Sequence, residues 1–425
     1  MPLLRSFNNA NLESTINAQL PTEVWRQILR QATHLEYSTT WDYDPDDRIW
    51  ADWQYEQPPD ATNSRTKHAI VRVCHEWRVI GSEYLYEIVT IPSSSKEFHR
   101  IPSLVEAFEG SASISPSGLG HGWWTKRINC PGDVLLSSSI VHFLRLLEQC
   151  HNLQVLCISG VVGAPKAHRI QLAQLLQSRF SHSLRRLELF GEDLMEDQEF
   201  TKTLPDIEIQ SFGISFSDVV LDLPLHQSLI NITTLTLDLA TSIHNFPLTW
   251  TFPFLRNLAL LRLESSDRRG LTPFLKRHGD TLRCLHIRSG PFSPIGDLLP
   301  SLISNAPSLQ SLSLKDFDLA NLTWPQTISP SGLTHIGIAL EDDDNSTAAL
   351  KSVMRIARLE TFPDLKLVQF LNWSGPGIDS AWMDVLEMCS KSGVELRNRY
   401  GKPIGPALDG QSHRHSLSER LEPCH

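Results

Sequence analysis

The hexamers LRCLHI (residues 282–287) and LQSLSL (residues 309–314) decide the fold of this chain of 425 residues. Each has apolar residues at its first, fourth and sixth positions. Side chains two residues apart share a face of a β-strand, so each hexamer is expected to hold a strand with one buried face. The same pattern recurs in LQVLCI (153–158), LRRLEL (184–189), IQSFGI (209–214), ITTLTL (232–237), LRNLAL (255–260), LTHIGI (333–338) and LKLVQF (365–370), and a degenerate tenth strand is expected at VEL (394–396).

The hexamers begin 23 to 32 residues apart, a spacing within the range of leucine-rich repeats. Apolar residues at helical spacing predict helices at 140–150, 169–180, 271–280, 295–307, 347–360 and 379–393. A strand followed by a helix at this period predicts an α/β leucine-rich-repeat solenoid, with parallel strands on its concave side and helices on its convex side. An ordinary α/β domain with leucine-rich strands is the alternative.

Composition and charge exclude several classes of protein. The chain has 38 basic and 48 acidic residues, a net charge of −10, and no long basic run, so we expect no nucleic-acid partner. Its seven cysteines form no CxxC pair, which argues against a disulfide framework and a zinc site. Neither a secretion signal nor a membrane-spanning run is present, so we expect no membrane partner and a cytoplasmic or nuclear location.

Two segments before the hexamers have helical character. LPTEVWRQILRQAT (20–33) has apolar residues at helical spacing, and Thr22 after Pro21 is a candidate cap. AIVRVCHEWRVIGSEYLYEIVTI (69–91) is interpreted as a helix, a turn at Gly81, and then a short helix or strand. These segments predict a small helical module ahead of the repeats.

The helical module resembles an F-box. The resemblance rests on the Leu-Pro opening at residue 20, the pair Ile28 and Leu29, and the spacing from Val73 to Trp77, followed by the aromatic residues of 84–86. An F-box followed by irregular leucine-rich repeats resembles F-box proteins of mushroom-forming fungi. GWWTKRI (122–128) and CSKSGVELRNRYG (389–401) are also similar to segments of that group, so the resemblance spans residues 20 to 401.

The resemblance implies a non-catalytic substrate-recognition subunit of an SCF-type E3 ubiquitin ligase. The F-box would bind a Skp-family adaptor, which links to a cullin and RING scaffold, and the repeats would bind the protein to be ubiquitinated. The adaptor-binding residues it implies are Leu20, Pro21, Val24, Ile28, Val73, Cys74 and Trp77, each of which also fits a place in the helix core. The alternative is a leucine-rich-repeat scaffold without a ligase role, whose helical module caps the solenoid.

The expected domain organisation follows from these segments. We expect a flexible N-terminus (1–19), an F-box-like domain (20–91), a linker leading into the solenoid (92–139), the solenoid (140–400) and a disordered tail (401–425). The F-box-like domain departs from a compact F-box by an aromatic and acidic insert at 34–68. An insert of that length is either functional or disordered.

The third and fifth positions of each hexamer are expected to face the groove of the solenoid. Of these eighteen positions only Arg186 and Glu188 are charged, so the groove suits a peptide or a folded protein surface. His286 and His335, with Arg288 and Lys315 at seventh positions, favour an acidic or phosphorylated segment. A solvated face without ligand preference is the alternative.

Catalytic and metal sites are not expected. Asp42, Asp44 and Asp46 have the spacing of a calcium loop, but Asp47 occupies the position that needs Gly and Trp53 the position that needs Glu. The sequence contains no phosphate-binding, zinc-protease or nucleophile-elbow motif. We therefore expect no enzyme activity, cofactor or metal.

Overall fold

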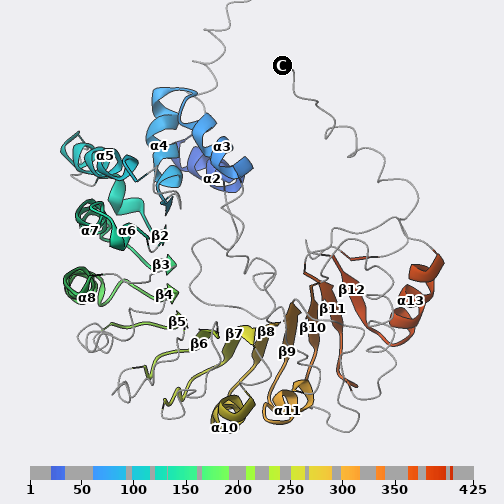
Figure 1. Ribbon diagram of the computed structural model, residues 1–425. Coiled ribbons are helices and arrows are strands. Elements are labelled where there is room, and N and C mark those ends of the chain that lie inside the picture. Colours follow the sequence, from blue (N-terminus) through green and yellow to red (C-terminus); the bar gives the residue numbers. More distant parts are fainter. Residues whose placement is uncertain are drawn as a thin grey trace, which may run out of the picture. The chain divides into compact units, whose positions relative to one another are not determined.

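The structure of the protein is a computed structural model. The described residues are 21–33, 61–91, 98–114, 120–131, 133–159, 165–190, 207–215, 229–239, 250–263, 268–289, 298–315, 332–339, 362–371, 380–398 and 403–404. They fall into two compact units, one ending at Ile209 and one beginning at Gln210. The protein is α/β, with a twelve-stranded sheet of parallel strands in chain order, β1 to β12 (Figure 1).

The first unit combines helices with the first strands of the sheet. Its helices are α2 (Thr22–Thr33), α3 (Ala61–Ile70), α4 (His75–Leu85), α5 (Arg100–Ile114), the 3-10 helix η3 (His121–Trp124), α6 (Asp133–Leu136), α7 (Ile140–Gln149) and α8 (Lys166–Phe180). Its strands are β1 (Ile88–Thr90), β2 (Arg127–Pro131), β3 (Val155–Ser159) and β4 (Arg186–Phe190). Helices α5, α7 and α8 lie along one side of these strands (Figure 1).

The second unit continues the alternation of strands and connections. Its strands are β5 (Ser211–Ser215), β6 (Thr234–Asp238), β7 (Asn257–Leu263), β8 (Cys284–Ser289), β9 (Ser311–Lys315), β10 (His335–Ile338), β11 (Leu367–Phe370) and β12 (Glu395–Arg397). Its described helices are α10 (Arg268–His278), α11 (Leu299–Ser304) and α13 (Ser380–Lys391).

The fourth and sixth positions of the hexamers build the core. In β8 and β9, Leu285 is the register partner of Leu312, and Ile287 is the partner of Leu314. All of these side chains are buried, as are their equivalents in the other hexamer strands. The nine hexamers therefore form β3 to β11 in parallel register, and the predicted tenth strand at VEL is β12.

Strand β1 lies at the end of 69–91, where the sequence predicts a short helix or strand, and β2 was not predicted. They lie in YEIVTI (86–91) and TKRINC (125–130), which follow the hexamer pattern with Tyr86 and Thr125 at the first position. Thr125 is buried, and its hydroxyl donates a hydrogen bond to the Tyr86 carbonyl at 2.9 Å, which satisfies the polar group there. The sheet thus begins inside the range expected for the F-box-like domain. The described part of 92–139, expected as a linker and the entry to the solenoid, contains α5, η3, β2 and α6.

The predicted turn at Gly81 is wrong, because Gly81 lies inside α4 and the turn precedes that helix at 71–73. A Cβ atom at Gly81 would lie 2.8 Å from Cγ2 of Ile70, the last residue of α3. Glycine is needed here for the close approach of α3 and α4, and it does not end the helix.

Several predictions fall outside the described residues. These are the helix at 347–360, most of the insert, the first nineteen residues and nearly all of the tail. The last part of the insert, from Ala61, belongs to α3.

The chain after β12 returns along the last strand. Arg397 and Pro403 form an antiparallel bridge, and the Ile404 amide donates to the Leu396 carbonyl at 2.8 Å. Residues 403–404 therefore line the free edge of β12. Among the helices that the structure describes, none combines the length and apolar character needed to cross a membrane.

Candidate interaction surfaces

The helical module formed by α2, α3 and α4 has a small core of its own. Leu29, Ile70 and Ile80 are buried in it, and Trp25, Trp77 and Tyr84 pack against them. The rings of Trp25 and Trp77 are tilted by 56° with centroids 4.9 Å apart, a favourable geometry for an aromatic pair. Trp77 thus joins α4 to α2, and its contact with the adaptor or support of the adaptor-binding helices stays a prediction.

Polar contacts also fix α2 against α4. Arg26 Nη2 lies 3.0 Å from Glu83 Oε1, and the Tyr84 hydroxyl donates to the Arg26 carbonyl at 2.8 Å. Burial is the larger cause that raises the pKa of Tyr84, and the nearby Glu83 carboxylate is the second. The hydroxyl therefore remains protonated and can donate at neutral pH. The relative position of α2 and α4 is therefore set by both packing and hydrogen bonds.

Cys74 is the N-cap of α4. Its backbone is extended, with φ −156° and ψ 175°, and its Sγ accepts a hydrogen bond from the Trp77 amide at 3.5 Å. An N-cap side chain satisfies one of the free amides of the first helical turn. The side chain is half-buried, so capping is a role that the sequence interpretation of Cys74 missed.

Large apolar side chains of the module remain exposed. Ile28 is 42% exposed, Val73 60% and Val79 52%. Pro21 is also exposed and Val24 is half-buried, whereas Leu20 lies outside the described residues. The exposure of Val79 was not predicted. It follows Trp77 by two residues, and such residues point to nearly opposite faces of a helix, so the core position of Trp77 would have indicated an exposed Val79. The module thus presents apolar side chains that its own core leaves uncovered.

The helical module is joined directly to the sheet. Strand β1 begins three residues after α4 ends. Lys126 Nζ lies 2.8 Å from Glu87 Oε1, and the Lys126 and Arg127 amides both donate to the Glu87 carbonyl. These contacts fix the end of α4 to the residues that begin β2.

The face of the strands that carries the third, fifth and seventh positions is named here the polar face. On β4 it carries Arg186 and Glu188, which are both buried and form an ion pair with each other. Burial alone would raise the pKa of Glu188, but the guanidinium groups of Arg186 and Arg127 hold it below its usual range. The two charges therefore neutralise each other, and the role of Arg186 and Glu188 as candidate target-binding residues of the groove stays a prediction.

A second polar network crosses β5 to β7. Asn257 Nδ2 donates to Thr234 Oγ1 at 3.0 Å, and Ser215 Oγ donates to Asp238 Oδ2 at 3.1 Å. Arg262, which has φ 55° at a register shift between β7 and β8, donates from Nε to Asp238 Oδ1 at 2.6 Å. The bulge directs the arginine toward Asp238, so these charges also neutralise each other.

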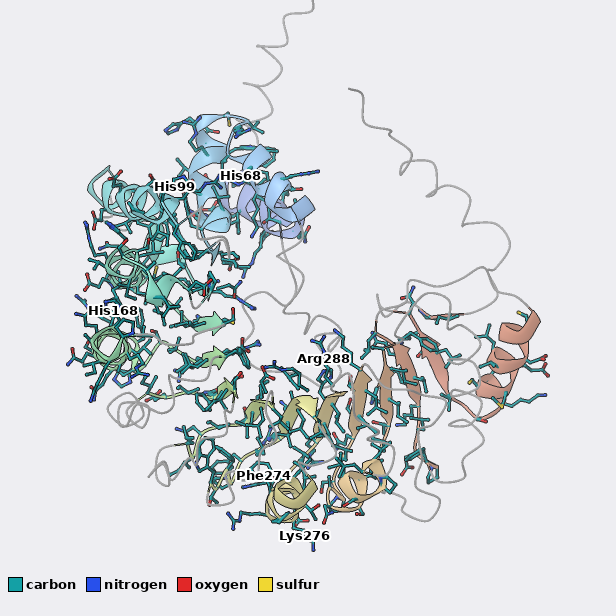
Figure 2. All side chains as sticks on the ribbon, in the orientation of Figure 1. His68, His99, His168, Phe274, Lys276 and Arg288 are labelled. Atoms are coloured by element: carbon teal, nitrogen blue, oxygen red, sulfur yellow. The ribbon has the colours of Figure 1, made fainter. Side chains whose placement is uncertain are left out.

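The polar face of β8 and β9 has a different charge pattern. His286 is buried, and its Nδ1 lies 2.9 Å from Ser313 Oγ. Burial, together with Lys315 and Arg288, lowers the pKa of His286 to about 3, so the ring is neutral at physiological pH. Arg288 and Lys315 are half-buried register partners (Figure 2 labels Arg288).

His335 lies on the next strand, β10. It is half-buried, and its Nδ1 lies 2.7 Å from Thr334 Oγ1. In register it faces Ser311 of β9. The structure therefore brings His286, Arg288, Lys315 and His335 onto adjacent strands of one face.

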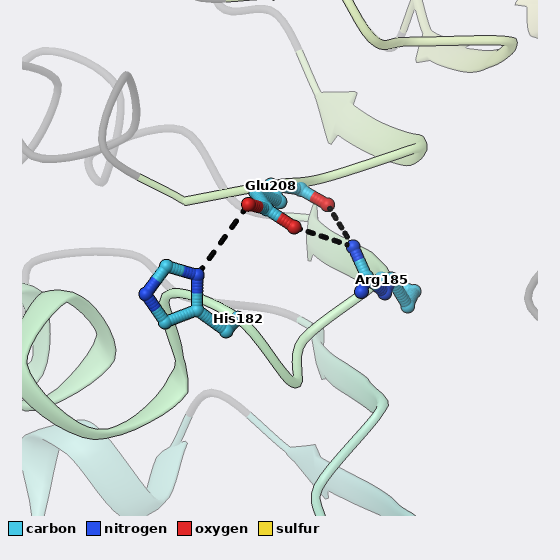
Figure 3. A network of polar contacts seen from close by, with 3 residues as sticks. All are labelled: His182, Arg185 and Glu208. Atoms are coloured by element: carbon cyan, nitrogen blue, oxygen red, sulfur yellow. Dashed lines mark hydrogen bonds and ion pairs between the residues drawn. The ribbon is translucent and has the colours of Figure 1, made fainter.

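A surface network connects the turn after α8 to the segment before β5 (Figure 3). Arg185 Nη1 lies 3.0 Å from Glu208 Oε2, and His182 Nδ1 lies 3.4 Å from Glu208 Oε1. Hydrogen bonds from Arg185 and then His182 lower the pKa of Glu208. The network is solvent-exposed and satisfies its own charges, which favours a structural role.

Metal-binding side chains do not gather in the described part of the chain. No three His, Cys, Asp or Glu side chains there are placed to hold a metal ion. The aspartates of the rejected calcium loop, residues 42–46, lie outside the described residues.

Comparison with known proteins does not assign a family. No model of a known protein family matches the chain, and no similar sequence is found among curated proteins.

Proposed function

We propose that the chain is the substrate-recognition subunit of an SCF-type E3 ubiquitin ligase. The helical module α2 to α4 acts as an F-box that binds a Skp-family adaptor, and through it the cullin and RING scaffold. The repeated strands form a leucine-rich-repeat solenoid that binds the target protein. The subunit itself is non-catalytic and works in the cytoplasm or nucleus.

The exposed apolar side chains of the module carry this proposal. Ile28, Val73 and Val79 lie on or between helices whose core is already filled by Leu29, Ile70 and Ile80. Burying one such side chain completely contributes about 1.5 to 3 kcal/mol, so leaving them in water is unfavourable unless a partner covers them. Two of them, Ile28 and Val73, are also residues on which the F-box resemblance rests.

The strands support the second half of the proposal. Each strand pairs in register with its chain neighbour, so equivalent positions of successive repeats form rows across the polar face. Such rows give an extended surface, which repeat proteins use to bind protein partners.

The test is binding to a purified Skp-family adaptor. The wild-type chain is expected to co-purify with the adaptor, and the double variant Ile28→Asp, Val73→Asp should weaken binding at least tenfold, because charges replace apolar contacts. Both positions are exposed, so the fold should persist. Val141→Asp, at a 57% exposed valine of α7, is the matched control and should bind as wild type. Absence of wild-type binding, or equal binding by the double variant, would refute the adaptor role.

A scaffold without a ligase role is the second candidate, and one observation favours it. The module leads directly into β1 and is fixed to β2 through Glu87 and Lys126. Those contacts are what a helical module that caps the first strands of the sheet would need. If the cap is its whole role, deleting residues 21–86 will expose β1 to β3 to rapid amide exchange, and no adaptor will bind the full chain.

A further inference from the structure

Two neighbouring turns of the second unit hold large apolar side chains in water. Residues 229–232 before β6 and 252–255 before β7 each form a turn in which the last amide donates to the first carbonyl at 3.2 Å. Ile230 in the first turn is 48% exposed, and Phe254 in the second is 56% exposed. The central residues of the turns before β8, β9 and β11 are instead polar residues or proline: 280–281, 307–308 and 363–364.

The two apolar side chains belong to adjacent repeats. Strands β6 and β7 pair in register, and neighbouring strands are about 4.8 Å apart, so the turns that precede them are neighbours at one edge of the sheet. One exposed apolar residue is common on a protein surface. Two on adjacent turns, where other repeats have polar residues, favour contact with a partner.

Two arginines follow at the same edge. Arg256 and Arg283 are the second residues of their hexamers, and the Arg283 amide donates to the Arg256 carbonyl at 2.7 Å, so the two residues are neighbours across β7 and β8. Both are exposed. Among the residues that the structure describes, no carboxylate forms an ion pair with either guanidinium group. Like charges on neighbouring strands repel, so an external anion would stabilise this pair.

The first unit shows how an arginine at this position can be neutralised. Arg185 is the second residue of its hexamer, and its Nη1 lies 3.0 Å from Oε2 of Glu208, the residue just before the next hexamer. For the two arginines of the second unit, the equivalent residues are Thr281 and Ser308, which carry no charge. A carboxylate supplied by a partner would complete the same kind of ion pair there.

The charge around the two arginines also favours an anion. The last turn of α10, which leads into the turn before β8, contains the exposed basic residues Lys276 and Arg277. Asp280 is the one acidic residue in the described segments that enter β6 to β9, which are residues 229–233, 250–256, 279–283 and 306–310. This edge of the sheet therefore combines exposed apolar groups with an excess of positive charge.

The exposed apolar and basic residues of this edge are named here the entry patch: Ile230, Phe254, Arg256 and Arg283. We propose that the entry patch binds an acidic segment of a partner protein that also carries aromatic or leucine side chains. Carboxylates of the segment pair with the two arginines, and its apolar side chains cover Ile230 and Phe254. Arginine and aromatic residues are enriched in protein interfaces, in agreement with such a contact.

The entry patch goes beyond the proposed function. It lies in the second unit, outside the helical module and outside the polar face, so it does not depend on adaptor binding. A protein segment is favoured over nucleic acid or an anionic membrane, because the chain has a net charge of −10 and an extended polyanion would repel much of it.

The test adds the full chain to fluorescein-labelled peptides of repeated tripeptide units and follows fluorescence anisotropy. The Glu-Glu-Phe peptide has both features, the Gln-Gln-Phe peptide lacks the charge, and the Glu-Glu-Ser peptide lacks the apolar side chains. Wild type should bind the Glu-Glu-Phe peptide at least tenfold more tightly than either other peptide, and less tightly as salt increases. No binding of the Glu-Glu-Phe peptide, or equal binding of all three, would overturn the proposal.

Two double variants separate the two contributions. Arg256→Gln, Arg283→Gln should weaken binding of the Glu-Glu-Phe peptide at least tenfold and remove most of its salt dependence. Ile230→Ser, Phe254→Ser should weaken binding at least tenfold and keep the salt dependence. All four positions are exposed, so the fold should persist, which circular dichroism checks.

Matched control variants change exposed residues elsewhere. Arg179→Gln, Lys366→Gln removes the same charge, and Lys366 is the second hexamer residue of β11, three strands from β8. Val141→Ser, Met383→Ser removes exposed apolar side chains of α7 and α13. Both controls should bind the Glu-Glu-Phe peptide within twofold of wild type. Losses equal to those of the entry-patch variants would contradict the inference.

Further measurements on the same samples distinguish the alternatives. Phosphatidylserine vesicles or an oligothymidylate that bind more tightly than the Glu-Glu-Phe peptide, with binding lost in Arg256→Gln, Arg283→Gln, would overturn the proposal. Adaptor binding should be unchanged in both entry-patch variants, and its loss would contradict a separate surface. If wild type binds the peptide but no adaptor, the ligase role fails and the entry patch stands. If it binds the adaptor but no peptide, only this inference fails.

Discussion

Cys74 shows how a side chain's role depends on its place in a helix. The sequence places it between Val73 and Trp77 and suggests a contact with a partner or a place in the core. The structure makes it the acceptor for the Trp77 amide. Sulfur is a weak acceptor, and cysteine is not among the preferred N-cap residues, so propensity alone did not indicate this role.

Replacing Cys74 by serine should therefore stabilise the helical module. Serine is among the preferred N-cap residues and its hydroxyl accepts more strongly, so we expect Cys74→Ser to raise the free energy of unfolding by up to about 1 kcal/mol. Cys74→Ala should lower it, because the Trp77 amide loses its acceptor. Urea denaturation followed by circular dichroism measures both. A serine variant less stable than the alanine variant would contradict the capping role.

The contacts of the polar face were predicted only in part, and the reason differs from residue to residue. Arg288 and Lys315 could be placed together because seventh positions of successive repeats align. The pairing of Arg186 with Glu188 follows from their places two residues apart on one face of one strand. The burial of His286 could not be predicted, since a histidine pattern in one strand does not reveal what covers it.

At the scale of elements, the strands were the most predictable feature. Buried apolar residues at the fourth and sixth positions mark the core face of each hexamer strand, and in β8 and β9 all of them are leucine or isoleucine. Strand β2 was missed because Thr125 replaces the first apolar residue. A buried threonine fits there only through its bond to the Tyr86 carbonyl, a tertiary contact that the pattern does not encode.

Two glycines of the first unit give a paired test of how the elements pack. A Cβ atom at Gly122 in η3 would lie 2.3 Å from the Gln149 carbonyl oxygen, whereas none of the surrounding atoms lies within 4 Å of a Cβ atom at Gly110 in α5. Gly122→Ala should therefore destabilise the protein by roughly 1 to 3 kcal/mol, since η3 must move away from the end of α7. Gly110→Ala should stabilise it by about 0.5 to 1 kcal/mol through helix propensity.

Thermal and urea unfolding of the two variants compare these effects directly. Opposite shifts in the transition midpoint are expected. Shifts in the same direction would mean that the close contact between η3 and the end of α7 does not control packing there.

At the scale of the whole chain, the order of strands in the sheet follows the order of the sequence. Each described strand ladder joins two strands that are consecutive in the chain, so pairing extends over one repeat at a time. Stability in such an array is a sum of local terms and nearest-neighbour interfaces. That is also why a repeated hexamer was enough to predict the sheet.

Nearest-neighbour coupling predicts how far the effect of a core substitution extends along the sheet. Leu312→Ala in β9 removes a fully buried side chain and should cost about 2 to 5 kcal/mol. Hydrogen exchange measured by mass spectrometry should accelerate most in β8, β9 and β10, and least in β5 and β12. Arg283→Ala, at an exposed position, is the control and should leave protection unchanged. Equal loss of protection throughout the second unit would contradict nearest-neighbour coupling.

The short return at residues 403–404 bears on the solubility of a protein built around an open sheet. An uncovered last strand offers unpaired amides and carbonyls to any other chain and is a template for aggregation. Here the Leu396 carbonyl already accepts the Ile404 amide, and Pro403 has no amide to offer outward. The return thus occupies part of the outer edge of β12, at the place where a strand of another molecule would otherwise pair.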